Sequence, residues 1–374
     1  MKNRIYKYFF HEFLRYFSVV IFGLTAVIWT IQAVNFLDLV TDDGHAFRIY
    51  LLYSILNVPK MLTKLIPFSF LIASILTILK LEKDNELIVL WTSGLNKIYI
   101  VNLVFRISIL IMIIQLIMSV IINPQTLNTS RTLLKNSELQ FVGSLLKEKQ
   151  FNDTLKGLTV FVDKKNNDGT FENIFIRDEG NVLSQVSSGS STIFAKSGYL
   201  RKNDKTLVLS NGNIQKLEKD GGISVIKFET TALNLSGLST KTTPVPKIQE
   251  TPTLEIIQCV IKENIYLRNC KQTEESYKEN VIEFNKRFGM PMFIPLISLI
   301  VCFLLSSRKE KKASGAYKYL YFFIGLFILI IAEITVRYSG ISWGHTAYYY
   351  LTPIGLLPLV YLFLIRVFKY ENLN

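Results

Sequence analysis

The clearest pattern along the chain is a set of long apolar runs with few charges. These runs cover residues 14–36, 51–79, 98–122, 288–305, 319–336 and 348–365. A helix needs about 20 apolar residues to cross about 30 Å of hydrocarbon, because each residue adds about 1.5 Å. The pattern therefore predicts six membrane-spanning helices in two blocks of three. The second run carries Lys60 and Lys64, but residues 65–79 are uncharged, so we predict that it also spans.

Between the two blocks the pattern changes to short β-branched segments separated by turn residues. The segments 158–162, 173–176, 192–195, 206–210 and 223–228 are typical of strands. Turns are expected at Asn-Asp-Gly 167–169, Asn-Gly 211–212 and Asp-Gly-Gly 220–222. No helices alternate with these strands, which argues against a parallel nucleotide-binding sheet. An antiparallel sandwich, jelly roll or open barrel is expected.

The predicted domain plan has four parts. Residues 1–122 form the first three spans, 123–253 the all-β domain, 254–287 a linker helix, and 288–374 the last three spans. The linker helix lies over the outer membrane face or forms a stalk, and both interpretations stay open. In the strands, alternate apolar residues line either the core of the β domain or a lipid groove, and a core is favoured: Val160, Val162, Ile174 and Ile176.

Composition and charge set the class and the orientation. The 374-residue chain is 49% hydrophobic with a mean hydropathy of +0.30, which excludes an ordinary soluble domain. Basic residues are concentrated in the predicted cytoplasmic segments: Lys2, Arg4, Lys7, Lys80, Lys83, Lys97, Arg308, Lys309, Lys311, Lys312, Lys318, Arg366 and Lys369. The two short outer loops hold Arg48 and Arg337. The positive-inside rule then predicts cytoplasmic termini and an external β domain.

This topology explains much of the net charge of +13, and no aromatic-basic motif supports nucleic-acid binding. The first apolar run is too long for a cleaved signal peptide and lacks a small-residue exit, so Met1 is expected to stay. Three scattered histidines predict no metal site and no cofactor. The cysteines, Cys259, Cys270 and Cys302, are expected to be unpaired apolar side chains, with a Cys259–Cys270 disulfide as the alternative.

The predicted cytoplasmic loop 81–97 reads LEKDNELIVLWTSGLNK. Asp84 is suited to cap a helix there, Glu86 lies in its first turn, and Gly94 is suited to end it. Its apolar residues, which include Leu87, Leu90 and Trp91, need a partner. They pack against the protein's own helices or headgroups, or they dock in a groove of a cytoplasmic protein with Trp91 as an anchor.

No G-x-x-x-x-G-K-[ST] sequence occurs, so the chain is not expected to hydrolyse ATP itself. The sequence resembles the lipopolysaccharide export permeases of the YjgP/YjgQ or LptF/LptG type over nearly its whole length. NELIVLWTSGLNK is similar to the coupling helix of that family, and Arg287 followed by Pro291 is similar to its Arg-x-x-x-Pro. EKQFND at 148–153, LTVFVDKK and GTFENIFI look more like the F-type permease.

The resemblance implies a periplasmic jelly roll between two helical blocks and a non-catalytic permease subunit in the inner membrane. Its implied partners are a G-type permease, a cytoplasmic ATPase dimer, a single-span periplasmic adaptor and lipopolysaccharide. By position, the ATPase-coupling residues of the family correspond to the loop helix: Asp84, Glu86, Leu87, Leu90, Trp91 and Gly94.

The resemblance also implies lipid entry between the first span of one permease and the fifth span of the other. Family members often place basic residues at the outer end of the first span, where this chain has Gln32 and Asn35. We hypothesise that Lys60 and Lys64, on one helical face, replace that charge; the alternative is that they only extend toward the membrane surface. Arg337, at the outer end of the fifth span, is the third basic candidate.

Other classes stay open as alternatives. A lipoprotein-releasing or mechanotransmission subunit also joins helices to a periplasmic domain, but usually has four spans. A sensor would need a signalling domain after the last span. A membrane enzyme would need clustered acids, histidines or a nucleophile, whereas the spans offer isolated charges; Glu333 and Arg337 are expected to form an i, i+4 pair.

Overall fold

The computed structural model describes residues 2–41, 46–145, 148–153, 157–166, 168–179, 190–201, 206–217, 222–234, 247–261, 274–306 and 314–371. The chain divides into two compact units. The first combines Met1–Ile31, Asn57–Asn128 and Lys247–Asn374; the second combines Gln32–Leu56 and Thr129–Pro246.

Six helical stretches in the described residues are long and apolar enough to cross a membrane. They are Arg4–Val40, Phe47–Lys83, Lys97–Leu134, Glu274–Leu305, Tyr319–Tyr338 and Trp343–Tyr370. Each contains one of the six apolar runs, so the expected spans are confirmed. The helical elements are α1 (Lys2–Asn35), α2 (Asp38–Thr41), α3 (Phe47–Leu56), α4 (Val58–Lys83), α5 (Glu86–Thr92), α6 (Lys97–Ile117), η1 (Met118–Ile122), α7 (Asn123–Leu145), η2 (Ile248–Glu250), α8 (Thr253–Ile261), α9 (Glu274–Gly289), η3 (Met290–Met292), α10 (Phe293–Val301), η4 (Cys302–Leu305), α11 (Ser314–Tyr338) and α12 (Trp343–Glu371).

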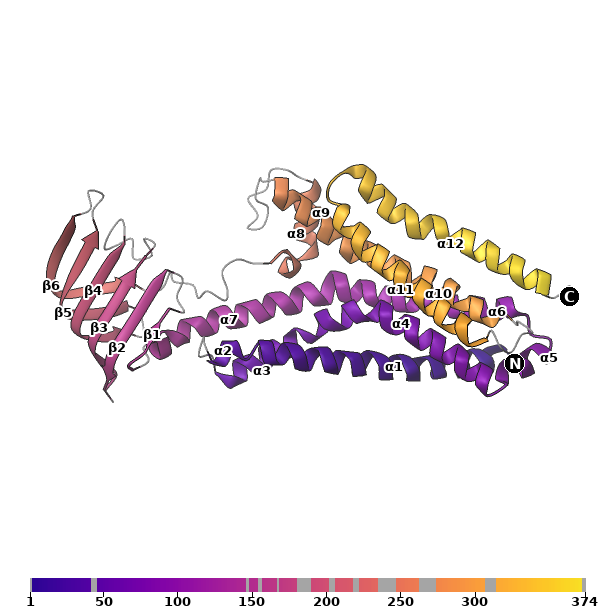
Figure 1. The fold of residues 1–374 in the computed structure, drawn as a ribbon, viewed down its shortest axis with the longest axis horizontal. Helices are drawn as coiled ribbons and strands as arrows, with labels where there is room; N and C mark the ends of the chain where they lie inside the picture. Colours follow the sequence, from indigo (N-terminus) through magenta and orange to yellow (C-terminus); the bar gives the residue numbers. More distant parts are fainter. Residues whose placement is uncertain are drawn as a thin grey trace. The chain divides into compact units, whose positions relative to one another are not determined.

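The core of the first unit is built around α10. All nine of its residues are buried, and it contacts α4, α6, α11 and α12. Figure 1 shows these helices running alongside one another. A helix that is apolar on every side can be buried in this way. On the outer helices, large apolar side chains remain exposed, as lipid-facing positions require: Ile113, Phe327 and Leu359.

The third span continues beyond its apolar run. α6 passes through the π-helical turn η1 into α7, so the helix runs past the expected boundary at residue 122. Pro124 lies within this continuous helix, just after η1, and its missing backbone N–H removes one helical hydrogen bond there. Leu127 and Leu134, seven residues apart, are both buried. This segment is polar on average, so its helix was not expected from composition, but its apolar residues lie at helical spacing.

Gly289 allows a close approach between α9 and α12. A Cβ atom there would lie 2.2 Å from Cε1 of the buried Tyr349 ring. Gly289→Ala is expected to lower the apparent thermal unfolding midpoint in detergent, because overpacking costs about 1–3 kcal/mol. Gly355→Ala in α12 is the matched control, since nothing lies within 4 Å of its added Cβ. Equal midpoints for the two variants would contradict this packing.

The structure corrects the expectation for one cysteine. Cys259, in α8, is disulfide-bonded, whereas the sequence favoured an unpaired side chain. Cys302 is free and buried, and Cys270 lies outside the described residues. Spacing alone could not decide the pairing, because connectivity depends on which segments the fold brings together.

Cys259→Ser is expected to abolish a disulfide that the parent chain retains in non-reducing buffer. Mass spectrometry of peptides digested without reductant should recover the Cys259 peptide in linked form, and reduction should release it. Cys302→Ser should leave that linked peptide unchanged. A free Cys259 thiol in the untreated parent would contradict the structure.

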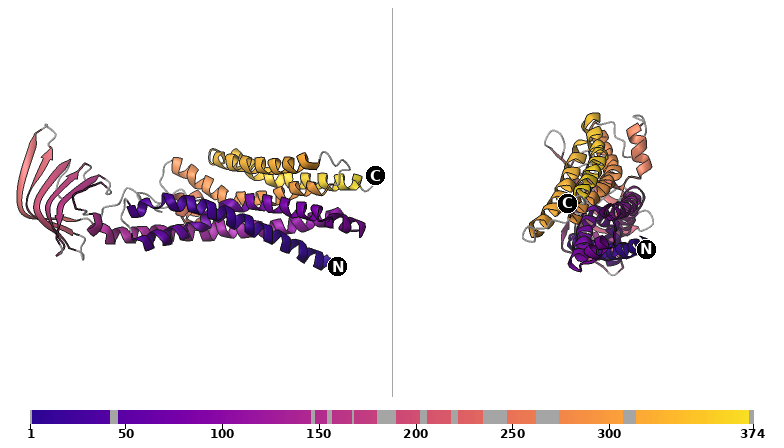
Figure 2. Two further views of the ribbon diagram at one scale, coloured as in Figure 1. Left: turned by 60° about the horizontal axis from the view of Figure 1, so that its bottom comes forward. Right: turned by 90° about the vertical axis from the view of Figure 1, so that its right-hand side faces the viewer.

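The second unit contains one antiparallel sheet of six strands in sequential order. The strands are β1 (Phe151–Asn152), β2 (Leu158–Lys165), β3 (Thr170–Asp178), β4 (Ser191–Arg201), β5 (Thr206–Leu217) and β6 (Ile223–Asn234). All five predicted strand segments fall within β2–β6, and Figure 2 shows the strands as one curved sheet. Val160, Val162, Ile174 and Ile176 are at most 6% exposed and belong to the apolar core of this unit.

One predicted turn is confirmed and another is wrong. Asp168 and Gly169 lie in the β2–β3 turn, where Gly169 has φ +85°. Asp168 accepts hydrogen bonds from the hydroxyl and from the backbone N–H of Thr170, and these bonds lower the pKa of its carboxyl. The Asn-Gly pair at 211–212 instead lies inside β5. Gly212 is needed there because a Cβ would meet the Phe194 carbonyl oxygen at 2.2 Å.

Candidate functional site

The loop between the second and third spans forms the short helix α5. Asn85 is its N-cap, in the left-handed region at φ 57°, so the structure does not use Asp84 as the cap. Asp84 instead ends α4. Gly94 follows α5 at φ +83°, where its N–H bonds to the carbonyl oxygen of Trp91 at 3.1 Å. The expected helix end at Gly94 is therefore confirmed.

The apolar side chains of α5 divide into an inner and an outer set. Leu87 is buried, and Leu90 and Trp91 are half-buried against the core of the first unit. The Lys97 ammonium lies 5.8 Å from the Trp91 ring centroid. The interpretation that the helix packs against the protein's own helices therefore holds for this inner set.

Ile88 and Val89 form the outer set and are 57% and 63% exposed. The docking interpretation of the sequence placed Trp91 as the anchor and did not single out this pair. Helical spacing separates the two sets, because each residue is turned by about 100° from the one before it. Leu87, Leu90 and Trp91, at spacings of three and four, share one face, and Ile88 and Val89 lie off that face. Two exposed β-branched residues beside an acidic first turn thus form a compact apolar surface.

Two polar contacts join α5 and the end of α4 to the start of α1. The Tyr8 hydroxyl donates to Glu86 Oε1 at 2.8 Å. Lys80 Nζ lies 2.9 Å from Glu12 Oε1, and this ion pair is mostly shielded from solvent. A mainly apolar groove of about 380 Å³ lies between these elements, with Asp84 and Glu86 on its lining. Through Glu86, α5 is thus directly connected to the first span.

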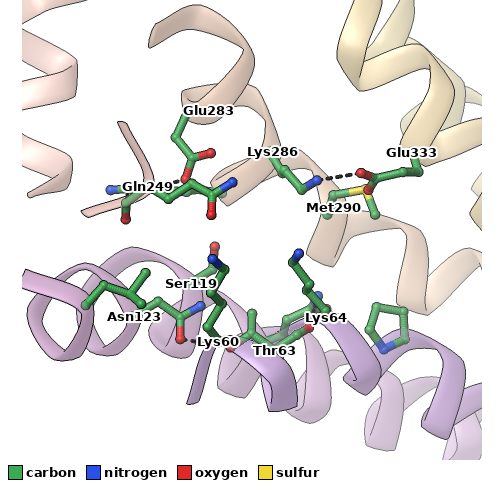
Figure 3. A pocket seen from close by; sticks show the side chains of 14 residues that line it. Lys60, Thr63, Lys64, Ser119, Asn123, Gln249, Glu283, Lys286, Met290 and Glu333 are labelled. Carbon is green, nitrogen blue, oxygen red and sulfur yellow. Dashed lines mark hydrogen bonds and ion pairs between the residues drawn. The ribbon is translucent and has the colours of Figure 1, made fainter. Parts of the chain in front are cut away.

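A second site is a cavity of about 320 Å³ lined from α4, the continuous helix α6–η1–α7, η2, α9, η3 and α11, and several of its lining side chains are charged. Figure 3 shows Lys60 and Lys64 reaching from α4 toward Glu283 and Lys286 on α9, with Glu333 at the side. The structure therefore brings together two lysines predicted as lipid candidates and three charged residues from distant parts of the sequence.

The charges in this cavity do not balance. Lys286 Nζ lies 2.5 Å from Glu333 Oε1, and Arg287 Nε lies 3.0 Å from Glu283 Oε1. Both carboxylates that line the cavity are therefore already ion-paired. Lys60 and Lys64 form no ion pair within the described part of the chain. The cavity therefore carries an excess of positive charge that attracts an anionic group.

The floor of the cavity adds neutral polar groups. Gln115 is 3% exposed, and its Nε2 donates to the Thr63 carbonyl oxygen at 3.3 Å. Its Oε1 has no hydrogen-bond partner among the described residues. An unpartnered buried acceptor is costly, so a ligand hydroxyl or a water would be stabilised there. The cavity can therefore receive an anion that also carries a hydrogen-bond donor.

The remaining lipid candidates do not line this cavity. Arg337 is exposed on α11, and its NH2 lies 3.9 Å from Glu333 Oε1. The expected i, i+4 pair therefore exists, but Lys286 is the closer partner of Glu333. Gln32 is half-buried and Asn35 exposed in the last turns of α1, within the second unit. No group of three metal-ligating side chains occurs among the residues described.

The fold and the two sites define a multi-pass membrane protein with an inserted antiparallel β domain. The family model of the lipopolysaccharide export system permease LptF/LptG matches residues 7–367, and the chain belongs to this family. A Rickettsia prowazekii (strain Madrid E) protein described as "Uncharacterized protein RP871" is 28% identical over 238 residues. That match covers 63% of this chain and 64% of the relative.

Proposed function

We propose that this chain is a permease subunit of an ABC transporter that extracts lipopolysaccharide from the inner membrane and passes it to a periplasmic bridge. Family membership supports the general role in lipopolysaccharide export. The observation that carries the specific proposal is α5, a short loop helix with an exposed apolar pair in a chain that has no phosphate-binding loop. Such a chain needs a separate ATPase to drive transport.

In this proposal the ATPase binds the outer surface of α5. Ile88 and Val89 fill an apolar groove of the ATPase, and Asp84 and Glu86 supply acidic contacts at its edge. Leu87, Leu90 and Trp91 anchor α5 to the spans, so that movement of the docked ATPase moves the helices with it. The Tyr8–Glu86 hydrogen bond gives this movement a direct route to the first span.

We propose that the charged cavity receives an anionic part of the lipid, either a phosphate or an acidic sugar. Lys60 and Lys64 supply the unmatched charge, and Arg337 adds a cation near Glu333. Exposing an acyl chain to water costs about 0.8 kcal/mol per CH₂, so the chains must stay covered while the headgroup is held. Gln32 and Asn35 then contribute neutral polar contacts on the first span.

The proposed orientation has both termini in the cytoplasm and the β domain in the periplasm. The excess of lysines and arginines in one set of loops supports it. The disulfide at Cys259 also supports it, because disulfides persist in oxidising compartments such as the bacterial periplasm. The segments 148–153, 158–165 and 169–176 favour the F-type subunit, paired with a G-type permease and a single-span adaptor.

The test is affinity purification of the tagged full-length chain in a mild detergent. We expect recovery of an ATPase and of a second permease with the same arrangement of spans. A chain that purifies without an ATPase under conditions that keep it folded would contradict the proposal. Recovery of an ATPase with a lipoprotein-releasing partner would favour that alternative instead.

A further inference from the structure

Arg287 lies beside the charged cavity, but its main contacts are made elsewhere. It is 2% exposed and belongs to the Arg-x-x-x-Pro sequence at the start of the fourth span. Its NH1 donates to the Thr251 carbonyl oxygen at 3.0 Å and to Thr253 Oγ1 at 2.7 Å. Its NH2 donates to the carbonyl oxygens of Ile248 and Gln249 at 3.4 and 3.2 Å. One guanidinium thus holds the whole segment 248–253.

Thr253 extends this network to the third span. Its hydroxyl accepts from Arg287 and donates to the Val120 carbonyl oxygen at 2.6 Å. Val120 lies in η1, the π-helical turn between α6 and α7. π-helical turns widen the helix locally and occur frequently at functional sites. The Arg287–Thr253–Val120 relay therefore joins the fourth span, the segment 248–253 and the π-helical turn.

Both points lie close in sequence to where the chain leaves the first unit, after Asn128, and re-enters it, at Lys247. After η1 the chain continues through α7 toward the strands, and segment 248–253 follows the strands in sequence. The same region borders the cavity, because Ser119, Asn123, Gln249 and Glu283 line it, as Figure 3 shows. A group that enters the cavity thus lies next to both connections.

We propose that Arg287 is a positioning residue for lipid transfer, which holds both connections to the β domain in one joint with the fourth span. This inference rests on the proposed transport function and adds the route by which helix movement reaches the β domain. Movement of the spans around the cavity is then passed to both connections together. Without the relay, ATP hydrolysis still moves the spans, but α7 and the segment 248–253 no longer move together with them.

The residue types at the joint support this assignment. Arginine has five donors in a rigid planar fork, which suits a cluster of oxygens around one point. Lysine keeps the positive charge but cannot reach the same set of oxygens from one position. Arg287→Lys therefore removes the joint while preserving the charge beside Glu283. Thr253→Val removes the hydroxyl of the relay at nearly constant volume, and Thr253→Ser restores it.

The test compares these variants in the purified complex, reconstituted in vesicles that contain lipopolysaccharide. Lipid released from the vesicles and ATP hydrolysed are measured in the same sample. Arg287→Lys and Thr253→Val are expected to lower the amount of lipid released per ATP by about tenfold, the factor that corresponds to about 1.4 kcal/mol. Thr253→Ser should keep the parent ratio. A residue with a purely structural role would lower both quantities together and leave their ratio unchanged.

Each outcome decides the proposal. An unchanged ratio in Arg287→Lys and Thr253→Val overturns it, and so does a loss in Thr253→Ser equal to that in Thr253→Val. If Arg287→Lys does not fold, the valine and serine pair at position 253 gives the answer. If the parent complex releases lipid in an ATP-dependent way and the variants release as much lipid per ATP, the role of Arg287 is refuted while the proposed transport function stands. A parent complex without such release refutes the proposed function and this inference with it.

Discussion

Glu86→Lys is expected to abolish recovery of the ATPase with the permease while the helical part of the chain stays folded. Glu86 lies in the first turn of α5, beside the exposed Ile88 and Val89. The change places a cation where the helix dipole and the proposed partner both favour an acid. Like charges placed opposite each other in an interface cost several kcal/mol, and even about 2 kcal/mol is roughly a thirtyfold loss of affinity. The measurement is the amount of ATPase recovered per permease.

The controls separate the docking surface from the internal contacts of Glu86. Tyr8→Phe removes the hydrogen bond to Glu86 but keeps the carboxylate, so ATPase recovery should persist. Glu82→Lys makes the same charge change at an exposed residue outside α5 and should also preserve it. Ile88→Asp should reduce recovery as Glu86→Lys does. Full recovery with both Glu86→Lys and Ile88→Asp would rule out α5 as the docking element.

A triple variant, Lys60→Gln, Lys64→Gln and Arg337→Gln, is expected to lower crosslinking of the permease to lipopolysaccharide by at least about tenfold. Hydrogen bonds to charged groups contribute about 1.5–3 kcal/mol each, so the loss of even one would produce such a change. The first two residues supply the unmatched charge of the cavity, and the third lies near Glu333. The measurement is photo-crosslinking to lipopolysaccharide in intact membranes.

ATPase recovery should be unchanged in this triple variant, because Lys60 and Lys64 lie at the start of the long helix α4, whereas α5 follows its other end, and Arg337 lies in α11. Lys164→Gln with Lys196→Gln and Lys227→Gln is a matched control, since it also removes three positive charges, from exposed lysines of the β strands. Crosslinking that stays at the parent level in the triple variant would contradict a lipid role for the cavity. An equal loss in the control would show a nonspecific charge effect instead.

The sequence predicts the elements of this fold better than their contacts. The six spans and five strands follow from local hydrophobic patterns, and each pattern is set within about 20 residues. The Asn-Gly pair at 211–212 was interpreted as a turn because both residue types favour turns. Gly212 instead lies so close to the Phe194 backbone of the neighbouring strand that no Cβ fits there. This contact depends on the packed sheet and cannot be inferred from the local sequence.

The same limit applies to the two sites. Lys60 and Lys64 were identified from their spacing, but Glu283, Lys286 and Glu333 come from helices more than 200 residues later. Their pairing leaves Lys60 and Lys64 as the excess charge, and this emerges only from the packed structure. In α5 the composition predicted an apolar helix that packs internally or docks with a partner, whereas the direction of each side chain determined that Ile88 and Val89 are exposed.

The most direct test of the account is lipid release by the purified complex in vesicles that contain lipopolysaccharide and phospholipid. We predict that ATP causes release of lipopolysaccharide in preference to phospholipid, and that a non-hydrolysable ATP analogue does not. Hydrolysis of ATP by a complex that contains this chain and a second permease, with no release of lipopolysaccharide, would contradict the account.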